Sequence, residues 1–350
     1  MALQASGQIK YSEIIAEFGT PNSGGIGEYR ISENVGSLSN LPLDADTCGV
    51  NANADIPQTG SIKFSDFYNS RLNQIVDLHS IGNNTSRQNA KDRWNNGNVH
   101  IVGSTKTGKT QPPDTIDDKV IINVNATIAS AKGTQTHCAL RTGNWDSNTS
   151  LKIEIGTSGK LYGSGGDGGT GGSANETPGT DGQTGSSALG IEYPCTINNL
   201  GVIQSGYGGG CGGGGNTRTT GGGKKGGATT NGSSGGGGGG GAGLPAGSAG
   251  GVSTPLSQGG GSAGSAGQAG SLSGQATGGA GGSEAGAGGD SGAVNNSSTK
   301  ANDGEQPSGA AEGGTGGNNG YAIITNQGSA PSLSGGGTLT GRTITSTNPT

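Results

Sequence analysis

The residues with the clearest potential for chemistry lie at Gly103–Thr110, which reads Gly-Ser-Thr-Lys-Thr-Gly-Lys-Thr. This stretch fits the phosphate-loop pattern GxxxxGK[ST], in which backbone N–H groups and a lysine hold the phosphates of a nucleotide. The mechanism also needs a helix that begins near Lys109, because a helix N-terminus binds the phosphate. Pro112 and Pro113 favour extended backbone instead, and the aspartates that follow place negative charge beside the site. We therefore interpret this stretch as a polar turn.

The residues that could bind a metal or act as nucleophiles are scattered along the chain. His79, His100 and His137 are isolated, and His137 and its neighbour Cys138 would point to opposite faces of a strand. No GxSxG nucleophile pattern lies between a strand and a helix. We expect no enzyme, no metal and no cofactor, and free thiols are favoured, although a Cys195–Cys211 disulfide stays open. The cysteines are Cys48, Cys138, Cys195 and Cys211.

The composition divides the chain into two regimes. Of its 350 residues 80 are glycine, with 14 of them in 1–150 and the other 66 in 151–350. Collagen is excluded because there are only 12 prolines and no sustained Gly-X-Y repeat. No stretch is long and apolar enough for a membrane helix, and the N-terminus does not resemble a secretion signal. The net charge is −5 and no basic stripe is present to bind a phosphate backbone, so we expect no nucleic-acid partner.

The glycine-rich region begins at Gly163 and repeats every three residues in two places. Glycine stands at every third position of 163–172 and of 261–270. A polyproline II helix has three residues per turn, so the repeat leaves one side of such a helix bare. The run Gly235–Gly241 is bare on every side. We predict a stack of polyglycine II helices over 163–320, with inserts that form turns at its ends. These inserts are Ser173–Asp181, Asn216–Thr220, Lys224-Lys225, Leu244–Ser257 and Asn295–Pro307.

Energetics decide whether this region is ordered. Fixing a glycine costs about 0.5–1 kcal/mol more than fixing an alanine, so the 40 glycines of 201–290 add about 20–40 kcal/mol. Each peptide that bonds a neighbouring helix contributes roughly 0.5–1.5 kcal/mol, and Cα–H···O contacts add about 0.5–1 kcal/mol. The total cost of fixing the glycines and the total gain from these hydrogen bonds and Cα–H···O contacts are of similar size, so an ordered stack is feasible.

The first 78 residues contain an internal repeat. Residues 6–14 and 59–67 both run from a small polar-glycine turn, through Ile-Lys and an aromatic residue, to a serine followed by an acid. Ser12 and Ser65 are typical helix N-caps, and an acid in the first turn is favourable there. We predict helices over Glu13–Phe18 and Asp66–Arg71, and we interpret 1–78 as a small α+β module that attaches the chain to a partner.

The remaining parts read as β structure. Residues 79–162 form a predicted β-rich domain in which Trp94 and Trp145 pack the core. The segments 191–206 and Tyr321–Asn326 flank the glycine-rich region, and 321–350 is a closing strand and tail. The expected fold is mainly β plus a polyglycine II helix stack and the small α+β N-terminal module. The strands predicted within 79–162 are Val99–Val102, Val120–Val124, Ala126–Ala129 and Leu151–Ile155.

Several segments carry a family resemblance. Leu140–Ile155, Gly159–Gly166 and Thr196–Gly206, with the poly-glycine that follows, resemble bacteriophage tail proteins that have a glycine-rich receptor-binding tip. That group includes the detachable tip adhesins of T-even-type long tail fibres. The closing pattern, Gly320–Asn326 and then Gly341–Ile344, is similar to that of the same group. The repeated N-terminal units resemble modules of other phage virion proteins.

The resemblance implies a virion protein of the tail fibre or baseplate, made in the host cytoplasm, whose end loops contact a host receptor. The receptor would be a protein or a glycan, the partners would be other phage tail, baseplate or fibre proteins, and a homotrimer stays open. The departure of residues 1–78 from the tip-adhesin pattern suggests direct attachment to a baseplate or fibre. The candidate receptor-contact residues are those that place large side chains within the glycine-rich sequence: Arg218, Lys224, Lys225, Leu244 and Leu256.

Two alternatives stay open at this point. The chain could be a purely structural fibre segment or spacer that binds no receptor. It could also be an ice-binding polyglycine protein, because a flat stack presents ordered hydroxyl groups, although the attachment module disfavours that function.

Overall fold

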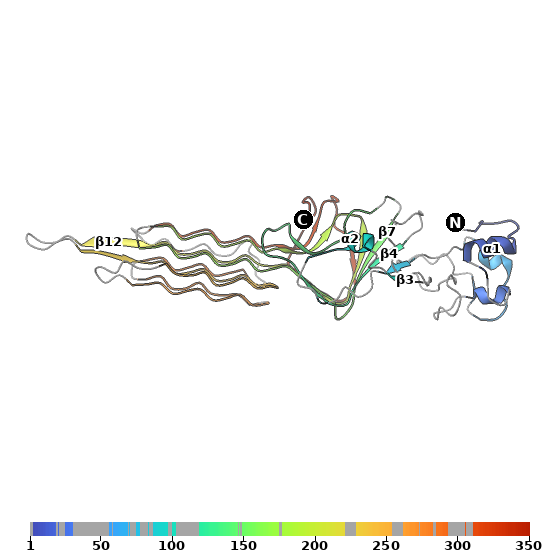
Figure 1. The fold of residues 1–350 in the computed structure, drawn as a ribbon, viewed down its shortest axis with the longest axis horizontal. Coiled ribbons are helices and arrows are strands. Elements are labelled where there is room, and N and C mark those ends of the chain that lie inside the picture. The colour runs from blue at the N-terminus through green and yellow to red at the C-terminus, as the bar shows by residue number, and fades with distance from the viewer. Residues whose placement is uncertain are drawn as a thin grey trace, which may run out of the picture.

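In the computed structural model the chain is elongated, and its parts follow one another along the long axis (Figure 1). Short helices near the N-terminus lie at one end, β-sheets form the middle, and long extended segments reach the other end. Among the residues described, no helix has the length and hydrophobicity to cross a membrane. The structure describes residues 3–18, 20, 25–30, 56–57, 59–68, 70, 75–77, 83, 87–96, 100–102, 119–145, 147, 149–174, 177–220, 229–253, 262–272, 274–282, 285–292, 305 and 311–350.

The N-terminal end is built from short helices around an aromatic core. Ile14, Tyr29 and Phe67 are fully buried, and the rings of Tyr29 and Phe67 meet edge to face with 6.2 Å between centroids. Such a pair contributes about 0.5–1.5 kcal/mol beyond its buried area, so these few rings hold the short elements together. The elements are α1 (Tyr11–Phe18) and the 3-10 helices η1 (Ile26–Tyr29) and η2 (Phe64–Phe67).

The sequence repeat in this part is also a structural repeat. Gly7 and Gly60 both have positive φ, at 98° and 84°, a conformation that favours glycine. In each copy a carboxylate in the first helical turn accepts the backbone N–H of the lysine before the helix, which satisfies a donor that the helix itself leaves open. The two bonds are Lys10 N–H to Glu13 at 2.7 Å and Lys63 N–H to Asp66 at 2.8 Å.

The predicted helix boundaries are corrected at both copies. The helices begin at Tyr11 and Phe64, one residue before Ser12 and Ser65, so the serines lie inside the first turn. The second helix is a single 3-10 turn that ends at Phe67, whereas the sequence predicted a helix from Asp66 to Arg71. The acid, and not the serine, makes the bond that fixes each helix start.

Three sheets make the middle of the molecule. The first contains, in spatial order, β15 (Ser332–Ser334), β10 (Cys195–Asn199), β7 (Ser150–Ile155), β4 (Lys119–Val124), β1 (Ile75–Asp77) and β3 (His100–Val102). The second contains β16 (Thr338–Thr340), β11 (Val202–Gln204), β8 (Lys160–Tyr162) and β5 (Thr127–Ala129). The third contains β17 (Arg342–Ile344), β14 (Tyr321–Thr325), β9 (Ser187–Ile191), β6 (Cys138–Arg141) and β2 (Gln88–Asn89).

The chain visits the three sheets in turn and thereby forms a parallel β-solenoid. Its successive coils are β4–β5–β6, β7–β8–β9, β10–β11–β14 and β15–β16–β17, and each coil pairs in parallel with the next. The strands predicted within 79–162 are confirmed as β3, β4, β5 and β7. The domain boundaries expected at 162 and 320 fall between strands of this one solenoid.

Aliphatic ladders fill the interior of the solenoid. Because parallel coils stack in register, the same inward position recurs from coil to coil. The ladders are Ile122–Ile153–Ile197 in the first sheet, Ile128–Leu161–Ile203 in the second and Leu140–Leu189–Ile323 in the third. None of these side chains is more than 2% exposed. Helix α2 (Ala90–Asn95) adds Trp94, which meets Trp145 edge to face at 5.6 Å and confirms both as packing residues.

The glycine-rich segments are two excursions from the solenoid. Residues 163–186 leave after β8 and return to β9, and residues 205–320 leave after β11 and return to β14. Their extended segments run side by side away from the sheets and back (Figure 1). At the end far from the sheets the chain forms an antiparallel hairpin of β12 (Asn216–Thr220) and β13 (Thr229–Ser233). We call this array of extended segments the glycine stack.

Backbone hydrogen bonds join the segments of the glycine stack. In segment 205–215 every third N–H donates to the same neighbour, at 2.7–3.1 Å. Gly206, Gly209, Gly212 and Gly215 donate to segment 177–186, whereas Tyr207, Gly210 and Gly213 donate to segment 234–243. In the third row, the carbonyls of Gly208, Cys211 and Gly214 accept N–H groups of segment 285–292, as where the Cys211 carbonyl receives the N–H of Gly289 at 2.9 Å. One segment therefore bonds neighbours in three directions.

Part of the predicted turn pattern is wrong. Leu244 does begin a turn, but the residues after it rejoin the stack, because Gly247 and Gly250 donate to Gly241 and Gly238 at 2.9 and 2.8 Å. Residues 179–186 are likewise bonded into the stack, and Asn216–Thr220 is strand β12. Lys224-Lys225 and, apart from Glu305, Asn295–Pro307 lie outside the described residues.

Candidate functional site

The interior of the glycine stack admits almost no side chains. A Cβ atom added to Gly210 would lie 1.8 Å from the Gly289 carbonyl oxygen, and one added to Gly238 would lie 2.0 Å from the Gly210 oxygen. Real Cβ contacts are not this short, and the obstructing atoms are backbone, which cannot swing away. Cys211, fully buried, is an exception within this segment. Side chains that could recognise another molecule are therefore found on the outer rows of the stack and at its ends.

The far end of the stack is organised around the β12–β13 hairpin and its contacts with Ser173, Ala174 and Thr177. The Ser173 N–H donates to the Thr177 hydroxyl oxygen at 2.5 Å. The Thr217 hydroxyl donates to the Ala174 carbonyl, and the Gly215 N–H donates to the Thr177 carbonyl at 3.1 Å. These bonds hold the base of the hairpin against the neighbouring segment.

A second group of residues borders the same end. The Ala285 N–H donates to the Gly282 carbonyl at 3.0 Å. The exposed Glu305 accepts the Gly214 N–H at 3.3 Å through its carbonyl and donates its own N–H to Ala287 at 2.9 Å. The far end thus presents hydroxyl groups and a carboxylate on a backbone that is held by hydrogen bonds.

The structure separates the candidate contact residues. Arg218 lies on β12 at the far end, paired in register with Asn231. Leu244 lies at the opposite end of the stack, beside the solenoid, where its N–H donates to the Gly163 carbonyl at 2.9 Å. Lys224, Lys225 and Leu256 lie outside the described residues. Arg218 and Leu244 therefore do not belong to one surface, and the contact role of all five stays a prediction.

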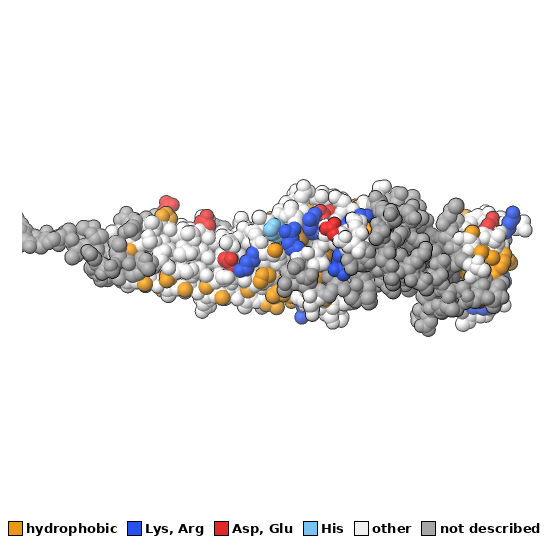
Figure 2. All heavy atoms as spheres, viewed as in Figure 1, with side chains coloured by type: hydrophobic (Ala, Val, Ile, Leu, Met, Phe, Trp, Pro, Cys, Tyr) orange, Lys and Arg blue, Asp and Glu red, His pale blue; other side chains and the backbone are white. Residues whose placement is uncertain are grey.

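The outer rows of the stack differ in chemistry from edge to edge. Figure 2 shows acidic side chains along one edge of the stack and small hydrophobic side chains along the opposite edge. Asp181 and Glu312 are exposed on segments 177–186 and 311–320, and Asp181 accepts both the N–H and the hydroxyl of Thr315 at 2.7 and 2.8 Å. The exposed apolar side chains of segments 246–253 and 262–271 are Ala249, Val252, Ala263, Ala266 and Ala269.

A charged bridge ties the stack to the solenoid. Lys132 Nζ lies 2.5 Å from Asp167 Oδ1, and the same oxygen accepts the Ser248 N–H at 2.6 Å. Burial of the Asp167 carboxylate opposes ionisation, but the bonds from Lys132 and Ser248 outweigh burial and lower its pKa below the ordinary 3.8. Asp167 is therefore ionised at neutral pH and joins a solenoid corner to two glycine-rich segments.

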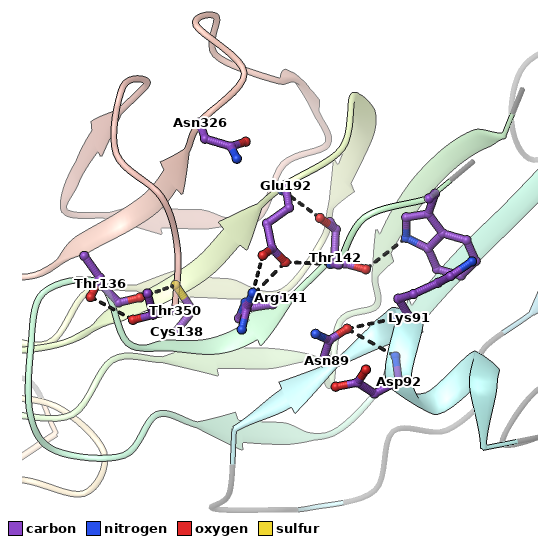
Figure 3. A network of polar contacts seen from close by, with 12 residues as sticks. Asn89, Lys91, Asp92, Thr136, Cys138, Arg141, Thr142, Glu192, Asn326 and Thr350 are labelled. Atoms are coloured by element: carbon purple, nitrogen blue, oxygen red, sulfur yellow. Dashed lines mark hydrogen bonds and ion pairs between the residues drawn. The ribbon is translucent and has the colours of Figure 1, made fainter. Parts of the chain in front are cut away.

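A buried polar network stabilises another corner of the solenoid (Figure 3). The Arg141 guanidinium binds both carboxylate oxygens of Glu192, and one of these oxygens also accepts the Gly143 N–H at 2.9 Å. The Thr142 hydroxyl accepts the Glu192 N–H at 2.8 Å, and the Thr142 carbonyl accepts the Trp145 indole N–H at 2.9 Å. Because the Arg141 and Glu192 charges are paired with each other, we interpret this network as a structural link between two adjacent coils.

Among the described residues, the remaining thiols, histidines and carboxylates do not form a group that could hold a metal ion. Cys138, Cys195 and Cys211 are free thiols, and burial raises the pKa of both Cys138 and Cys195 to about 12. Within the described part of the chain no group of His, Cys, Asp and Glu is placed to hold a metal ion. The predicted polar turn Gly103–Thr110 and His79 lie outside the described residues.

Sequence reasoning did not anticipate which residues build the far end. Thr177 and Thr217 carry ordinary polar side chains in a region rich in such residues, and only their partners across the turn and hairpin distinguish them. One signal was available, because Thr177 follows the end of the glycine repeat over 163–172 and Thr217 follows the run Gly212–Gly215.

Comparison with known proteins gives one family and one solved structure. A family model described as phage tail fibre adhesin Gp38 matches residues 94–344. No curated protein matches the chain. The crystal structure of the gp37-gp38 adhesin tip complex of the bacteriophage S16 long tail fiber is similar at 18% identity, over 98% of this chain and 99% of that chain. The TM-score of that match is 0.35, too low to establish a common arrangement, so the family rests on residues 94–344.

Proposed function

The chain belongs to the phage tail fibre adhesin Gp38 family, and from this premise we propose that the far end of its glycine stack is the part that touches the host receptor. The family confirms the resemblance noted in the sequence and makes the protein a receptor-binding tail fibre protein, located in the tail of the virion. An adhesin family points to a structural role and not to an enzyme.

The observation that carries the proposal is the exclusion of side chains from the interior of the stack. With backbone atoms 1.8–2.2 Å from the Cβ position at most interior glycines, variation in sequence is tolerated only at the surface and the ends. The β12–β13 hairpin projects from the end farthest from the solenoid (Figure 1). A rigid stack with variable end loops suits an adhesin, because a receptor can change while the support does not.

We further propose that the segments of the stack are polyglycine II helices. The three-residue alternation of hydrogen-bond partners along 205–215 supports this, because polyglycine II-type helices have three residues per turn and leave their amides free for neighbours. Each such segment can then bond neighbours on all sides, which a β-strand cannot do.

Residues 1–78 suit the role of attachment module, with another fibre or tail protein as partner. Phe64 is 44% exposed and stacks edge to face with Tyr11 at 6.5 Å, so an aromatic surface is available on a small folded unit. Aromatic side chains contribute strongly to protein interfaces. Tyr11 is the first residue of α1 and Phe64 is the first residue of η2, so this aromatic surface lies where the two copies of the repeat meet.

Loop replacement tests the receptor proposal. Residues 221–228 would be replaced by a Gly-Ser segment of equal length, with Arg218→Glu as a point variant in the same hairpin. We expect the phage adsorption rate to fall at least about tenfold, because a few contacts dominate most interfaces. Leu272→Ala is the matched control and should adsorb normally, because Leu272 lies at the other end of the stack, where its carbonyl accepts the Gln204 side-chain amide at 2.7 Å. Normal adsorption with both hairpin variants would refute receptor contact through this end of the stack.

A second experiment tests whether the receptor is a protein or a glycan. Host cells would be treated either with protease or with periodate, which destroys surface glycans, before purified protein is added. Because the described far end offers hydroxyl groups and a carboxylate, we propose a polar receptor surface. Loss of binding after one treatment identifies a protein or a glycan receptor.

A further inference from the structure

Two neighbouring segments on one edge of the glycine stack carry an apolar side chain at every third residue. Their glycines face each other, because Gly267 and Gly270 donate their N–H groups to Gly250 and Gly247 at 3.2 and 2.8 Å. The apolar side chains face outward and are at least partly exposed (Figure 2). We call these two rows the apolar edge: Ala246, Ala249 and Val252 on one segment, and Ala263, Ala266, Ala269 and Leu272 on the other.

The backbone of the two rows is left open to a neighbour. Within the described part of the chain, the N–H and C=O groups of Ala263, Ala266 and Ala269 make no hydrogen bond, and the row from Ala246 to Val252 makes none either. Elsewhere on the same segment, the Gln268 N–H donates to the next segment of the stack at 2.9 Å. The apolar edge thus resembles the edge strand of a sheet, where unpaired donors and acceptors can bind another chain.

A Cβ atom on an outward row blocks such binding. Where two segments of the stack meet, a Cβ added to Gly240 would lie 2.2 Å from the Gly247 oxygen, and one added to Gly239 would lie 2.2 Å from the Ala276 oxygen. Ordinary contact begins at 3.4 Å, so a methyl group holds a further segment more than an ångström beyond the spacing of the stack. Backbone hydrogen bonds need about 2.7–3.2 Å and cannot form at that separation.

We propose that the apolar edge is a steric stop that prevents the glycine stack of one molecule from joining the stack of another. Charge does not protect this edge, because residues 246–253 and 262–272 contain no charged residue. The opposite edge differs, since the exposed Asp181 and Glu312 repel a second copy there. A bare glycine row at the apolar edge would offer another molecule the same backbone surface that the segments of the stack offer one another. This inference does not depend on receptor contact.

Replacing a row by glycine tests the proposal, because glycine removes the stop and adds no new group. Each of two triple variants bares one row, Ala263→Gly/Ala266→Gly/Ala269→Gly or Ala246→Gly/Ala249→Gly/Val252→Gly. In analytical ultracentrifugation of the full-length chain at about 1–100 µM, each should self-associate at least about tenfold more tightly than the parent chain. The serine row, Ala263→Ser/Ala266→Ser/Ala269→Ser, keeps every Cβ atom and should sediment like the parent chain.

The matched control adds three glycines at positions where no backbone group becomes available. Gln183, Ser248 and Gln268 are exposed, and both backbone groups of each are already bonded within the stack. Gln183→Gly/Ser248→Gly/Gln268→Gly should therefore sediment like the parent chain. Added glycine destabilises the control and the glycine-row variants alike, so their melting curves should agree and show that all of them are folded.

The outcomes separate the steric stop from other causes. Association of the glycine-row variants, with neither the serine row nor the control associating, supports the proposal. Sedimentation of both glycine-row variants like the parent chain overturns it. Equal association of the serine row overturns it too, since the Cβ atoms are still present, and equal association of the control would make added glycine itself the cause. Host adsorption by the hairpin variants is measured separately, so failure of one proposal leaves the other untouched.

Discussion

Replacing Gly210 by alanine tests whether the stack depends on backbone packed directly against backbone. The new Cβ would lie 1.8 Å from the Gly289 oxygen and 2.6 Å from the Gly289 carbonyl carbon. The Gly210 N–H also donates to the Gly239 carbonyl at 2.7 Å, so moving this segment aside weakens a hydrogen bond as well. Gly251→Ala is the matched control, because its nearest neighbour to a new Cβ is Thr170 Cγ2 at 4.0 Å.

The magnitudes predict effects of opposite sign at the two positions. Overpacking costs about 1–3 kcal/mol, and a lost hydrogen bond adds about 0.5–1.5 kcal/mol. Alanine also reduces the conformational entropy of the unfolded chain, which stabilises the folded state by about 0.4–1 kcal/mol. Gly210→Ala should therefore be destabilised by about 1–4 kcal/mol, whereas Gly251→Ala should be neutral or gain up to about 1 kcal/mol.

Calorimetry of the two variants measures the difference. At about 2–4 °C per kcal/mol for a folding unit of this size, Gly210→Ala should melt roughly 2–16 °C below the parent chain. Gly251→Ala should melt at or slightly above the parent temperature. Equal melting temperatures for Gly210→Ala and Gly251→Ala would refute the steric argument, because the two changes are chemically identical and differ only in their surroundings.

Three further predictions follow from the polar contacts. Glu192→Ala should lower the free energy of unfolding in chemical denaturation by about 3–5 kcal/mol, since it leaves the Arg141 charge without its carboxylate. A loss below about 1 kcal/mol, the value of an exposed ion pair, would contradict a structural role for this network. Burial opposes ionisation of Asp167, but the bond from Lys132 lowers its pKa, so Asp167→Asn should lower the melting temperature at neutral pH. That difference should vanish as the pH falls below the lowered pKa, and a difference independent of pH would exclude the bridge. Burial raises the pKa of the Cys138 thiol to about 12, so iodoacetamide at about pH 8 should label it only after unfolding, as intact mass would show.

The sequence predicted the elements that have strong local signals. Val120–Val124 is rich in β-branched residues and Leu151–Ile155 alternates apolar and charged residues, and both are strands of the solenoid. Tyr321–Thr325 was likewise anticipated from its run of apolar residues. The three-residue glycine repeat pointed to extended segments, and the stack shows that periodicity in its hydrogen-bond partners.

The solenoid itself could not be predicted from local signals. Strands β15 and β16 are only three residues long, and Ser332–Ser334 and Thr338–Thr340 read as loop by composition. What makes them strands is pairing with β10 and β11, which lie across the long glycine-rich excursion in the sequence. The same holds for the turn prediction at Leu244–Ser257, where tertiary hydrogen bonds draw Gly247 and Gly250 into the stack.

The candidate site was predictable only in outline. The sequence indicated that residues interrupting glycine would be exposed, which singled out Arg218 in the far hairpin. It could not indicate which end of the stack each insert occupies, because that depends on the number and direction of the segments between them. Leu244 was grouped with Arg218 for this reason, although the stack places them at opposite ends.

Amide hydrogen exchange of the native full-length chain tests the central claim most directly. The claim is that glycine backbone, bonded to neighbouring backbone, forms a rigid support. Peptides covering 205–215 should exchange slowly, as the core of the solenoid does, because these N–H groups are buried and bonded. Exchange of 205–215 at the rate of an unstructured glycine-rich peptide would contradict the account.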